Sequence, residues 1–170
     1  MQKERDWWRK WQEGIMTPTL HRLVFLDESG VNTNLTRRYG RAFVKERVKD
    51  CVPLNKTKNT TILSSMRLDG SVAYTTYSGG TTGDKFIGYL KETLIPTLRP
   101  WDIVVMDNLR THHIDEVRRL LSEAGVMLMY LPAYSPDLNP IEMMWSKVKA
   151  ILRKAKGRTE ETLIAAIKEA

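Results

Sequence analysis

Three acidic residues stand out because their surroundings predict positions where carboxylates can act together. Asp27 and Asp107 each follow a short apolar run that is typical of a buried strand. Glu142 lies in the first turn of a segment whose apolar residues have helical spacing. If the two strands are neighbours, the aspartates lie side by side at the carboxyl ends of the strands, where chemistry gathers in parallel sheets. The helix then brings Glu142 in from the flank.

The chemistry that such a cluster supports is metal-dependent cleavage of phosphodiesters. Three crowded carboxylates repel one another unless cations neutralise them. Oxygen ligands without cysteine or histidine select Mg²⁺ or Mn²⁺. Two such ions close together suit an in-line attack on a phosphodiester, because one activates the nucleophile and the other stabilises the leaving oxygen.

Each acid also has an ordinary structural interpretation. Asp27 and Asp107 are followed by turn-forming residues, and an aspartate after a strand is often only part of a turn. With Asn139 as the N-cap and Pro140 in the first helical position, Glu142 takes the third position, where the glutamate of a capping box belongs. The residues alone leave these alternatives open.

The elements that would position these acids follow from the apolar patterning and the turn residues. Strands and helices alternate after an early hairpin at Asp69-Gly70, which predicts a mixed sheet with helices on both faces, an α/β fold. Thr17-Pro18-Thr19 ends the first helix. Trp7, Trp8 and Trp11 form an apolar face on this helix, which either the rest of the domain or a partner must cover. Five strands are expected, at residues 23–27, 60–68, 71–77, 102–106 and 126–131. Helices are expected over residues 1–14, 83–95, 114–124, 140–153 and 159–170.

Composition narrows the class of protein. The chain has 170 residues and a net charge of +7, from 27 Lys and Arg against 20 Asp and Glu. This length supports one domain with an ordinary core. The positive charge favours nucleic acid first and an anionic membrane second as partners, although a basic enzyme with neither has the same composition. One cysteine, Cys51, excludes an intramolecular disulfide, and with three His a structural zinc site is not expected. Met1–Arg9 is polar, so secretion is not indicated.

Three short sequence motifs favour the catalytic interpretation of the acids over the structural one. They are Leu26–Gly30 (LDESG), Met106–His112 (MDNLRTH) and Leu131–Trp145 (LPAYSPDLNPIEMMW). All three resemble the DDE catalytic domain of bacterial insertion-sequence transposases in the mariner superfamily. That family is related to retroviral integrases and has an RNase H-like fold. The 34 residues between Asp107 and Glu142 match one branch of it, and the resemblance covers about residues 20–153.

The resemblance implies a five-stranded RNase H-like domain that cuts DNA at transposon ends and joins them to a target. Asp27, Asp107 and Glu142 would be the catalytic residues and the ligands of two Mg²⁺ or Mn²⁺ ions. Asn108 and His112 match the Asp-Asn-x-x-x-His pattern of the family and would line the site, orienting a carboxylate or a phosphate. Packing at the start of a helix is the alternative for His112.

Other residues receive less specific roles. The basic stretch over residues 37–58 is the expected DNA surface, with Arg37, Arg38 and Arg41 as its leading candidates. Lys147 is a further candidate for phosphate contact near Glu142, although exposed helix lysines are usually only solvated. The loop over residues 134–136 would set the following helix in place, and Trp145 belongs to its apolar stripe and therefore to the core.

The predicted domains are a linker helix over residues 1–19, the DDE endonuclease domain over residues 20–156 and a truncated C-terminal helix over residues 157–170. Relatives carry an N-terminal helix-turn-helix region that this chain lacks, so a separate DNA-binding part is expected, and the chain would be half of a split gene or a decayed copy. Expected partners are double-stranded DNA and a second copy of the chain, without a membrane, in the cytoplasm with the nucleoid. The alternative function is an inactive remnant that binds DNA or inhibits intact transposase.

Overall fold

The chain folds around a mixed five-stranded sheet, as the sequence predicts. The computed structural model describes residues 2–37, 39–54 and 59–170, apart from the side chains of residues 12, 15–18 and 110. The strand order is β3-β2-β1-β4-β5, with β1, β4 and β5 parallel and the β1–β2 and β2–β3 pairs antiparallel. The strands are β1 (Leu23–Val31), β2 (Thr60–Arg67), β3 (Val72–Ser78), β4 (Ile103–Met106) and β5 (Met127–Tyr130).

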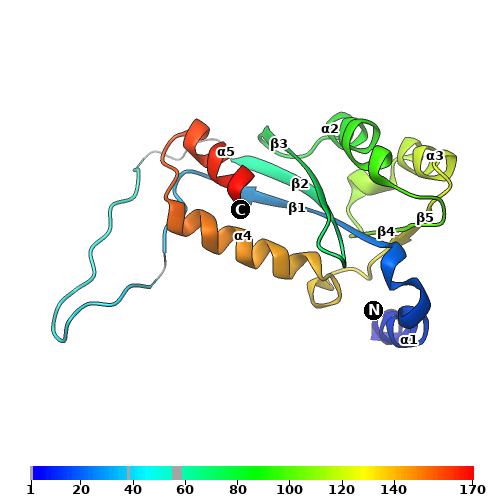
Figure 1. Ribbon diagram of the computed structural model, residues 1–170, viewed down its shortest axis with the longest axis horizontal. Coiled ribbons are helices and arrows are strands. Elements are labelled where there is room, and N and C mark those ends of the chain that lie inside the picture. Colours follow the sequence, from blue (N-terminus) through cyan, green and yellow to red (C-terminus); the bar gives the residue numbers. More distant parts are fainter. Residues whose placement is uncertain (1, 38, 55–58) are drawn as a thin grey trace.

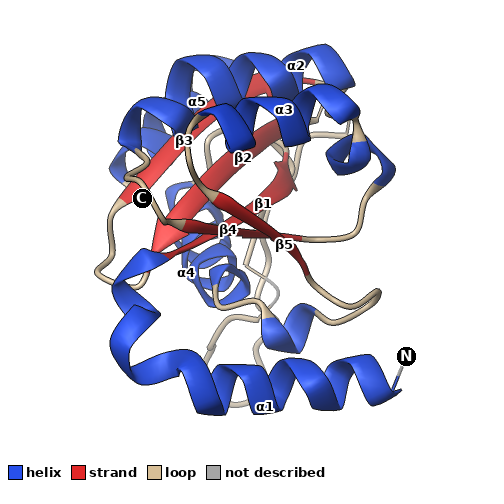
Figure 2. Ribbon diagram, turned by 90° about the vertical axis from the view of Figure 1, so that its right-hand side faces the viewer, coloured by secondary structure: helices blue, strands red, loops and turns tan. Residues whose placement is uncertain are grey.

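Helices cover both faces of this sheet (Figures 1 and 2). One face packs against α2 and α3, and the other packs against α4 and α5, with α1 beside them. The helices are α1 (Gln2–Thr19), α2 (Gly83–Tyr89), α3 (Asp115–Glu123), α4 (Ile141–Ala155) and α5 (Glu160–Glu169). Thr82 caps α2, which continues as a π turn (Leu90–Leu94) and a 3-10 turn (Ile95–Thr97). None of the helices in the described part is long and apolar enough to cross a membrane.

Alternation along β1 decides which side chains reach which face. Val24 and Leu26 belong to the core under α2 and α3, whereas Leu23 and Phe25 belong to the core under α4. Because successive side chains of a strand point to opposite faces, Asp27 lies on the α4 face. The central strand is apolar on both faces since both are covered by helices.

Two predicted boundaries were wrong. Asp27 does not end its strand, because β1 continues to Val31 by pairing with the antiparallel β2, in which Ser64 lies opposite Asp27. Only the parallel pairing with β4 stops before it, at Leu26. The first helix also continues through residues 17–18 to Thr19. A proline in the last turn removes only one backbone hydrogen bond, so it does not end the helix at once.

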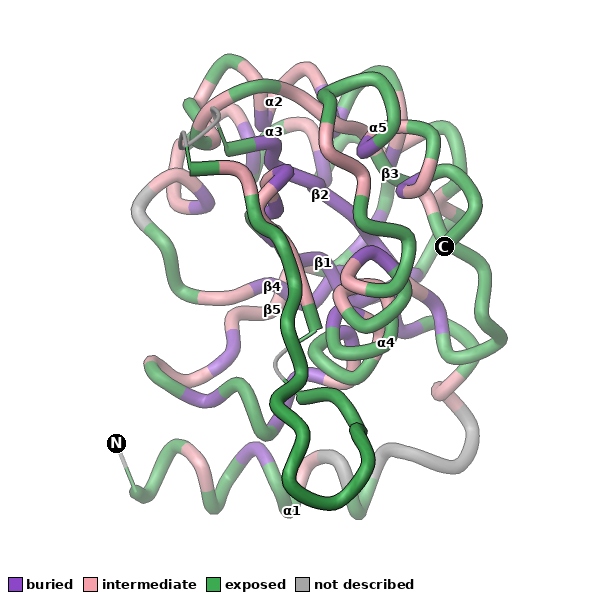
Figure 3. Tube along the Cα trace, turned by 90° about the vertical axis from the view of Figure 1, so that its left-hand side faces the viewer, coloured by how far each residue is buried: buried purple, intermediate pink, exposed green. Residues whose placement is uncertain are grey.

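The segment over residues 32–59 joins β1 to β2 without regular structure in its described part. Its described residues 36–37 and 39–54, which we call the projecting loop, extend from the body of the molecule (Figure 1) and are exposed along most of their length (Figure 3). The hairpin at Asp69-Gly70 is confirmed, because Gly70 has a φ of +90° between β2 and β3.

Candidate active site

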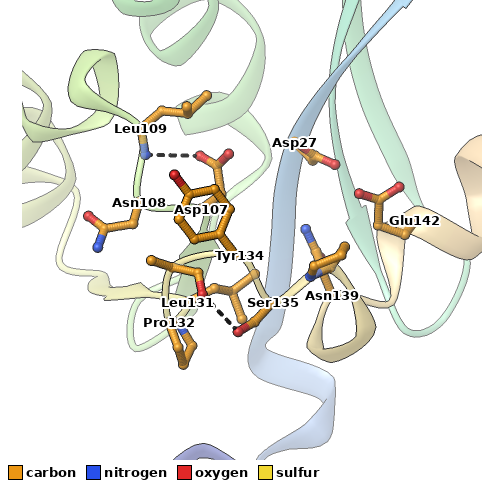
Figure 4. Close-up of a pocket in the computed structure, with 12 residues that line it drawn as sticks. Asp27, Asp107, Asn108, Leu109, Leu131, Pro132, Tyr134, Ser135, Asn139 and Glu142 are labelled. Atoms are coloured by element: carbon orange, nitrogen blue, oxygen red, sulfur yellow. Dashed lines mark hydrogen bonds between the residues drawn. The ribbon is translucent and has the colours of Figure 1, made fainter. Parts of the chain in front are cut away.

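The three predicted acids line one pocket on the α4 side of the sheet, at the carboxyl end of β4 (Figure 4). The pocket has a volume of about 330 Å³, and Asp27, Asp107 and Glu142 all contribute to its wall. They come from three elements: the middle of β1, the residue after β4 and the first turn of α4. Residues separated by 115 positions in the sequence, from 27 to 142, therefore meet only in the folded chain.

The register of β1 and β4 explains why the two aspartates share this pocket. Leu26 lies opposite Met106 in the parallel pair, so Asp27 and Asp107 are the next residues of each chain segment. Leu26 and Met106 both belong to the core on the far face. Side chains one position further along then project to the near face, which α4 covers. Glu142 enters from the start of α4 on this same side.

Asp27 is the most buried of the three acids and is electrostatically unusual. Asp27 is only 9% exposed. The pKa of Asp27 is raised from 3.8 to about 6, mainly by burial and to a smaller extent by the charges of Glu142 and Asp107. Hydrogen bonds from the Glu28 amide and the Trp145 indole act in the opposite direction. Without a bound cation, Asp27 therefore ionises less readily than an exposed aspartate does.

Trp145 contributes to the site in a way that sequence reasoning missed. The helical spacing predicts a core residue, and Trp145 is indeed 3% exposed. Its Nε1 also donates a hydrogen bond of 3.1 Å to Oδ2 of Asp27, while the Glu28 amide donates to Oδ1 at 2.8 Å. A signal did exist, because a buried tryptophan needs an acceptor for its N–H. Which acceptor it would find is not encoded in the helical pattern.

Asp107 is held by a buried histidine behind the pocket. Nδ1 of His112 lies 2.7 Å from Oδ1 of Asp107 and 3.2 Å from the Asp107 carbonyl oxygen. Both partners are acceptors, so Nδ1 is the nitrogen that carries the proton. His112 is fully buried and packs against Phe86, and it is not among the residues that line the pocket. It contacts a carboxylate rather than the open pocket.

The capping interpretation of Glu142 was wrong. Pro140 is the N-cap residue of α4, and no side chain caps the helix. The Glu142 amide instead donates to the backbone carbonyl of Asn139 at 3.1 Å. The reason is that the 3-10 turn over Pro136–Leu138 carries the Asn139 side chain into the pocket wall, away from the helix end. Glu142 is exposed and its side chain faces Asp27 (Figure 4).

The lining of the pocket suits a hard divalent cation. Besides three carboxylates it includes the amides of Asn108 and Asn139, and no Cys, His, Lys or Arg is among its described lining residues. Asn139 is 5% exposed, and its Oδ1 has no hydrogen-bond partner among the residues that the structure describes. Oxygen donors of this kind are those that Mg²⁺ and Mn²⁺ prefer. Across the described part of the chain, however, no three acids, histidines or cysteines are already gathered closely enough to hold a metal ion.

Asn108 lines the pocket, as expected from the sequence motif, and is itself held by His113. Oδ1 of Asn108 contacts Nε2 of His113. The His113 ring stacks on Tyr130, with centroids 4.2 Å apart. His113 thus supports the residue that reaches the pocket.

The loop before α4 is tied to α1, which the sequence did not predict. Arg5 donates to Oγ of Ser135 at 2.8 Å and pairs with Asp137 at 2.7 Å. Tyr134 in this loop is 92% exposed, has a φ of +54° and lines the pocket. We call the contacts of Arg5 with residues 135–137 the clasp. The clasp is consistent with the predicted role of this loop, which is to position the helix that carries Glu142.

Three of the predicted DNA-contacting residues are described by the structure, and all three lie outside the pocket. Arg37 and Arg41 are exposed on the projecting loop, which starts near Asp27 in sequence but points away from the sheet (Figure 1). Lys147 is exposed on α4 and does not line the pocket. Arg38 lies outside the described residues.

Comparison with known families points to one group of enzymes. Residues 22–164 match the family described as DDE superfamily endonuclease, and this range includes all three acids. No curated protein sequence matches the chain.

Solved structures share the fold at low sequence identity. The Mos1 transposase paired-end complex with left transposon end has a TM-score of 0.75 at 19% identity, and the match covers 97% of this chain and 51% of that chain. The Mos1 transposase catalytic domain with raltegravir and Mg has a TM-score of 0.67 at 20% identity, covering 97% and 76%. A simian T-cell lymphotropic virus intasome in complex with PP2A regulatory subunit B56 gamma has a TM-score of 0.60 at 15% identity, covering 86% and 47%. The chain thus spans about half the length of the transposase in the first complex, and the fold is RNase H-like.

Proposed function

Because this chain belongs to the DDE superfamily of endonucleases, we propose that it is the catalytic domain of a DNA transposase. Its reaction is the cleavage of phosphodiester bonds at transposon ends and their transfer to target DNA. The observation that carries the proposal is the convergence of Asp27, Asp107 and Glu142 on one pocket. The similarity in fold to a transposase bound to a transposon end supports it.

The same three acids would hold two Mg²⁺ or Mn²⁺ ions. Support comes from the oxygen-only donors of the pocket, from the unpartnered Oδ1 of Asn139 and from the raised pKa of Asp27. A structure of similar fold, the Mos1 catalytic domain, contains Mg. The chemistry that such ions supply when bound is activation of the attacking oxygen and stabilisation of the leaving oxygen.

The chain's own residues keep the carboxylates in place for this reaction. The indole N–H of Trp145 and the Glu28 amide each bind one oxygen of Asp27, which fixes the plane of its carboxylate. His112 fixes Asp107 from behind. Since fixed ligands lose little freedom when they bind, this arrangement favours a defined geometry at the reacting phosphate. Asn108, which lines the pocket, would orient a phosphate through its amide.

Double-stranded DNA, both transposon ends and target, is the proposed substrate, bound in part through Arg37, Arg38, Arg41 and Lys147. A separate helix-turn-helix part would recognise the transposon ends. A second copy of the chain is a further proposed partner, and the projecting loop supports it. That loop exposes large apolar side chains beside its basic ones, among them Tyr39, Phe43 and Leu54, which is unusual for a surface that meets only water or phosphate. A bacterial enzyme with this substrate would act in the cytoplasm, associated with the nucleoid.

The alternative of a non-catalytic remnant is not favoured. A remnant that only binds DNA has no need of three acids on one pocket, and their mutual repulsion would remain uncompensated. The hydrogen bonds to Asp27 and Asp107 would also serve no purpose beyond packing.

A nicking assay on supercoiled plasmid tests the proposal. The chain should nick DNA with Mg²⁺ or Mn²⁺ and not in the presence of a chelator, and Asp107→Asn should abolish nicking without unfolding the protein. Asp115→Asn is the matched control, because Asp115 is an exposed acid near the same loop that does not line the pocket. Undiminished nicking by purified Asp107→Asn would reject the assignment.

A further inference from the structure

A second pocket opens beside the catalytic pocket and shares a wall with it. It has a volume of about 420 Å³ and lies between α1 and the segment that follows β5. Four residues line both pockets: Asn108, Leu131, Pro132 and Ala133. A polymer that leaves the catalytic pocket on this side therefore passes directly into the second pocket.

The outer wall of this second pocket is an exposed tryptophan that is held in place. Trp7 lines the pocket and is 55% exposed. Trp11, which does not line the pocket, stacks on Trp7 with 6.4 Å between ring centroids and 18° between planes. Trp8 meets Trp7 edge-on and is itself anchored, because it is buried and its Nε1 donates to the Tyr130 carbonyl at 3.1 Å. The Trp7 ring is thus fixed by its neighbours while a large part of it faces solvent.

The chemistry of these walls suits a nucleobase. A fixed indole offers a flat apolar surface, and base–aromatic stacking needs such a surface without any particular sequence. Lys3 lies one helical turn before Trp7 and lines the same pocket, which adds a positive charge for a phosphate. Glu4 also lines it but already has an interaction of its own. The exposed amide of Asn108 borders the shared wall.

We propose that this second pocket binds an unpaired nucleotide of the DNA strand whose phosphate occupies the catalytic pocket, with its base stacked on Trp7. The proposal rests on the proposed function, since it assumes that the catalytic pocket binds DNA. The nucleotide must be unpaired, because a base within a duplex has both faces covered by its neighbours. The site would therefore hold a strand end, or a base displaced from the duplex, next to the bond that is cleaved.

The test compares two DNA probes under conditions that prevent cleavage. The full chain is titrated with Ca²⁺ in place of Mg²⁺, since a hard cation is needed to offset the three carboxylates of the catalytic pocket. The probes are a blunt duplex and the same duplex carrying a short single-stranded overhang that contains a fluorescent adenine analogue. We expect the overhang duplex to bind more tightly and the analogue to be quenched. Trp7→Ala should weaken overhang binding roughly 10-fold, abolish the quenching and leave blunt-duplex binding unchanged. Trp7→Phe, which keeps an aromatic face, should retain most of the preference.

Trp101→Ala is the matched control. Trp101 is 67% exposed and lies at the opposite end of β4 from Asp107, so its loss should change neither affinity nor quenching. Unchanged overhang binding and unchanged quenching in Trp7→Ala would overturn the stacking site alone. An altered sedimentation coefficient of Trp7→Ala with unaltered DNA affinity would overturn it in favour of a protein interface. If the wild-type chain bound neither duplex, the proposed function would fail as well.

Discussion

At the scale of single residues, the burial of Asp27 makes the stability of the metal-free protein depend on pH. Its pKa is raised from 3.8 to about 6, so the folded state holds this proton more tightly than the unfolded state does. The contribution of Asp27 to stability is then most favourable below about pH 4, falls as the pH rises to about 6 and is constant above that. The difference amounts to about 3 kcal/mol at most.

Replacing Asp27 by Asn removes this ionisation. Asn has only one acceptor oxygen, so it loses one of the two hydrogen bonds that Asp27 accepts, at a cost that does not depend on pH. In chelator, we therefore expect the melting temperature of Asp27→Asn, relative to that of the parent, to rise by several degrees between about pH 4 and pH 7. Thermal melts of both proteins across this range measure the effect, and the difference between them cancels the other titrating groups. A difference in melting temperature that stays the same at all pH values would show that burial has no effect on the pKa of Asp27.

Glu142 can be tested with a substitution that keeps its size. Glu142→Gln removes a negative charge from the pocket, and the helix does not depend on the side chain because α4 has no side-chain cap. We expect a melting temperature within a few degrees of the parent and a loss of metal-dependent nicking of at least about 100-fold.

The control for Glu142→Gln is Glu161→Gln. Glu161 occupies the second position of α5 as Glu142 does of α4, and it lies outside the pocket. Its replacement reports the effect of one negative charge near a helix N-terminus, which is at most about 1 kcal/mol. Nicking preserved in Glu142→Gln, with a stability loss larger than in Glu161→Gln, would reduce Glu142 to a structural role.

At the scale of elements, the clasp between Arg5 and residues 135–137 links α1 to the helix that carries Glu142. Arg5→Ala should reduce nicking several-fold while lowering stability by less than about 1 kcal/mol, because Arg5 and Asp137 are both partly exposed. Hydrogen exchange should quicken in the loop over residues 133–139. These three measurements separate a loosened active-site loop from a general loss of stability.

Arg9→Ala provides the comparison for Arg5→Ala. Arg9 also approaches Asp137, but at 3.7 Å and with half of its side chain exposed, so its removal should leave nicking and exchange nearly unchanged. If the two variants behaved alike, the effect would come from net charge rather than from the contacts that Arg5 makes with Ser135 and Asp137.

At the scale of the whole molecule, the net charge of +7 and the position of the basic residues decide how DNA is bound. Charges on an irregular loop neutralise phosphates without reading bases, so we expect the chain to bind unrelated duplexes with similar affinity and to lose affinity steeply with salt. Replacing Arg37 and Arg41 by Ser should lower the slope of log affinity against log salt by about 2.

Arg119→Gln serves as the control for these loop variants. Arg119 is already paired with Glu116 and Glu123 at 2.7 Å each, so its removal should leave the salt dependence unchanged. A strong preference of this chain for one duplex sequence at physiological salt would show that some element reads base edges. An unchanged slope in the Arg37 and Arg41 variant would assign the projecting loop to a protein partner instead.

The sequence by itself determined the sheet, the helices around it and the three acids. Apolar runs and turn residues are local signals, so five strands and the Asp69-Gly70 hairpin could be predicted, and the alternation of side chains follows from strand geometry. The acids could be selected because the residues next to them form strings that resemble a known family. Local patterns, however, left the capping and turn interpretations open.

Only the tertiary structure decided what each acid contacts. The parallel register of β1 and β4 brings Asp27 and Asp107 to one face, and this pairing joins segments that are far apart in sequence. The hydrogen bond from Trp145 to Asp27 links residues 118 positions apart, and the clasp of Arg5 on Ser135 links residues 130 apart. Such contacts depend on how the layers pack, because side-chain direction and distance across the core are not written in the period of any one element.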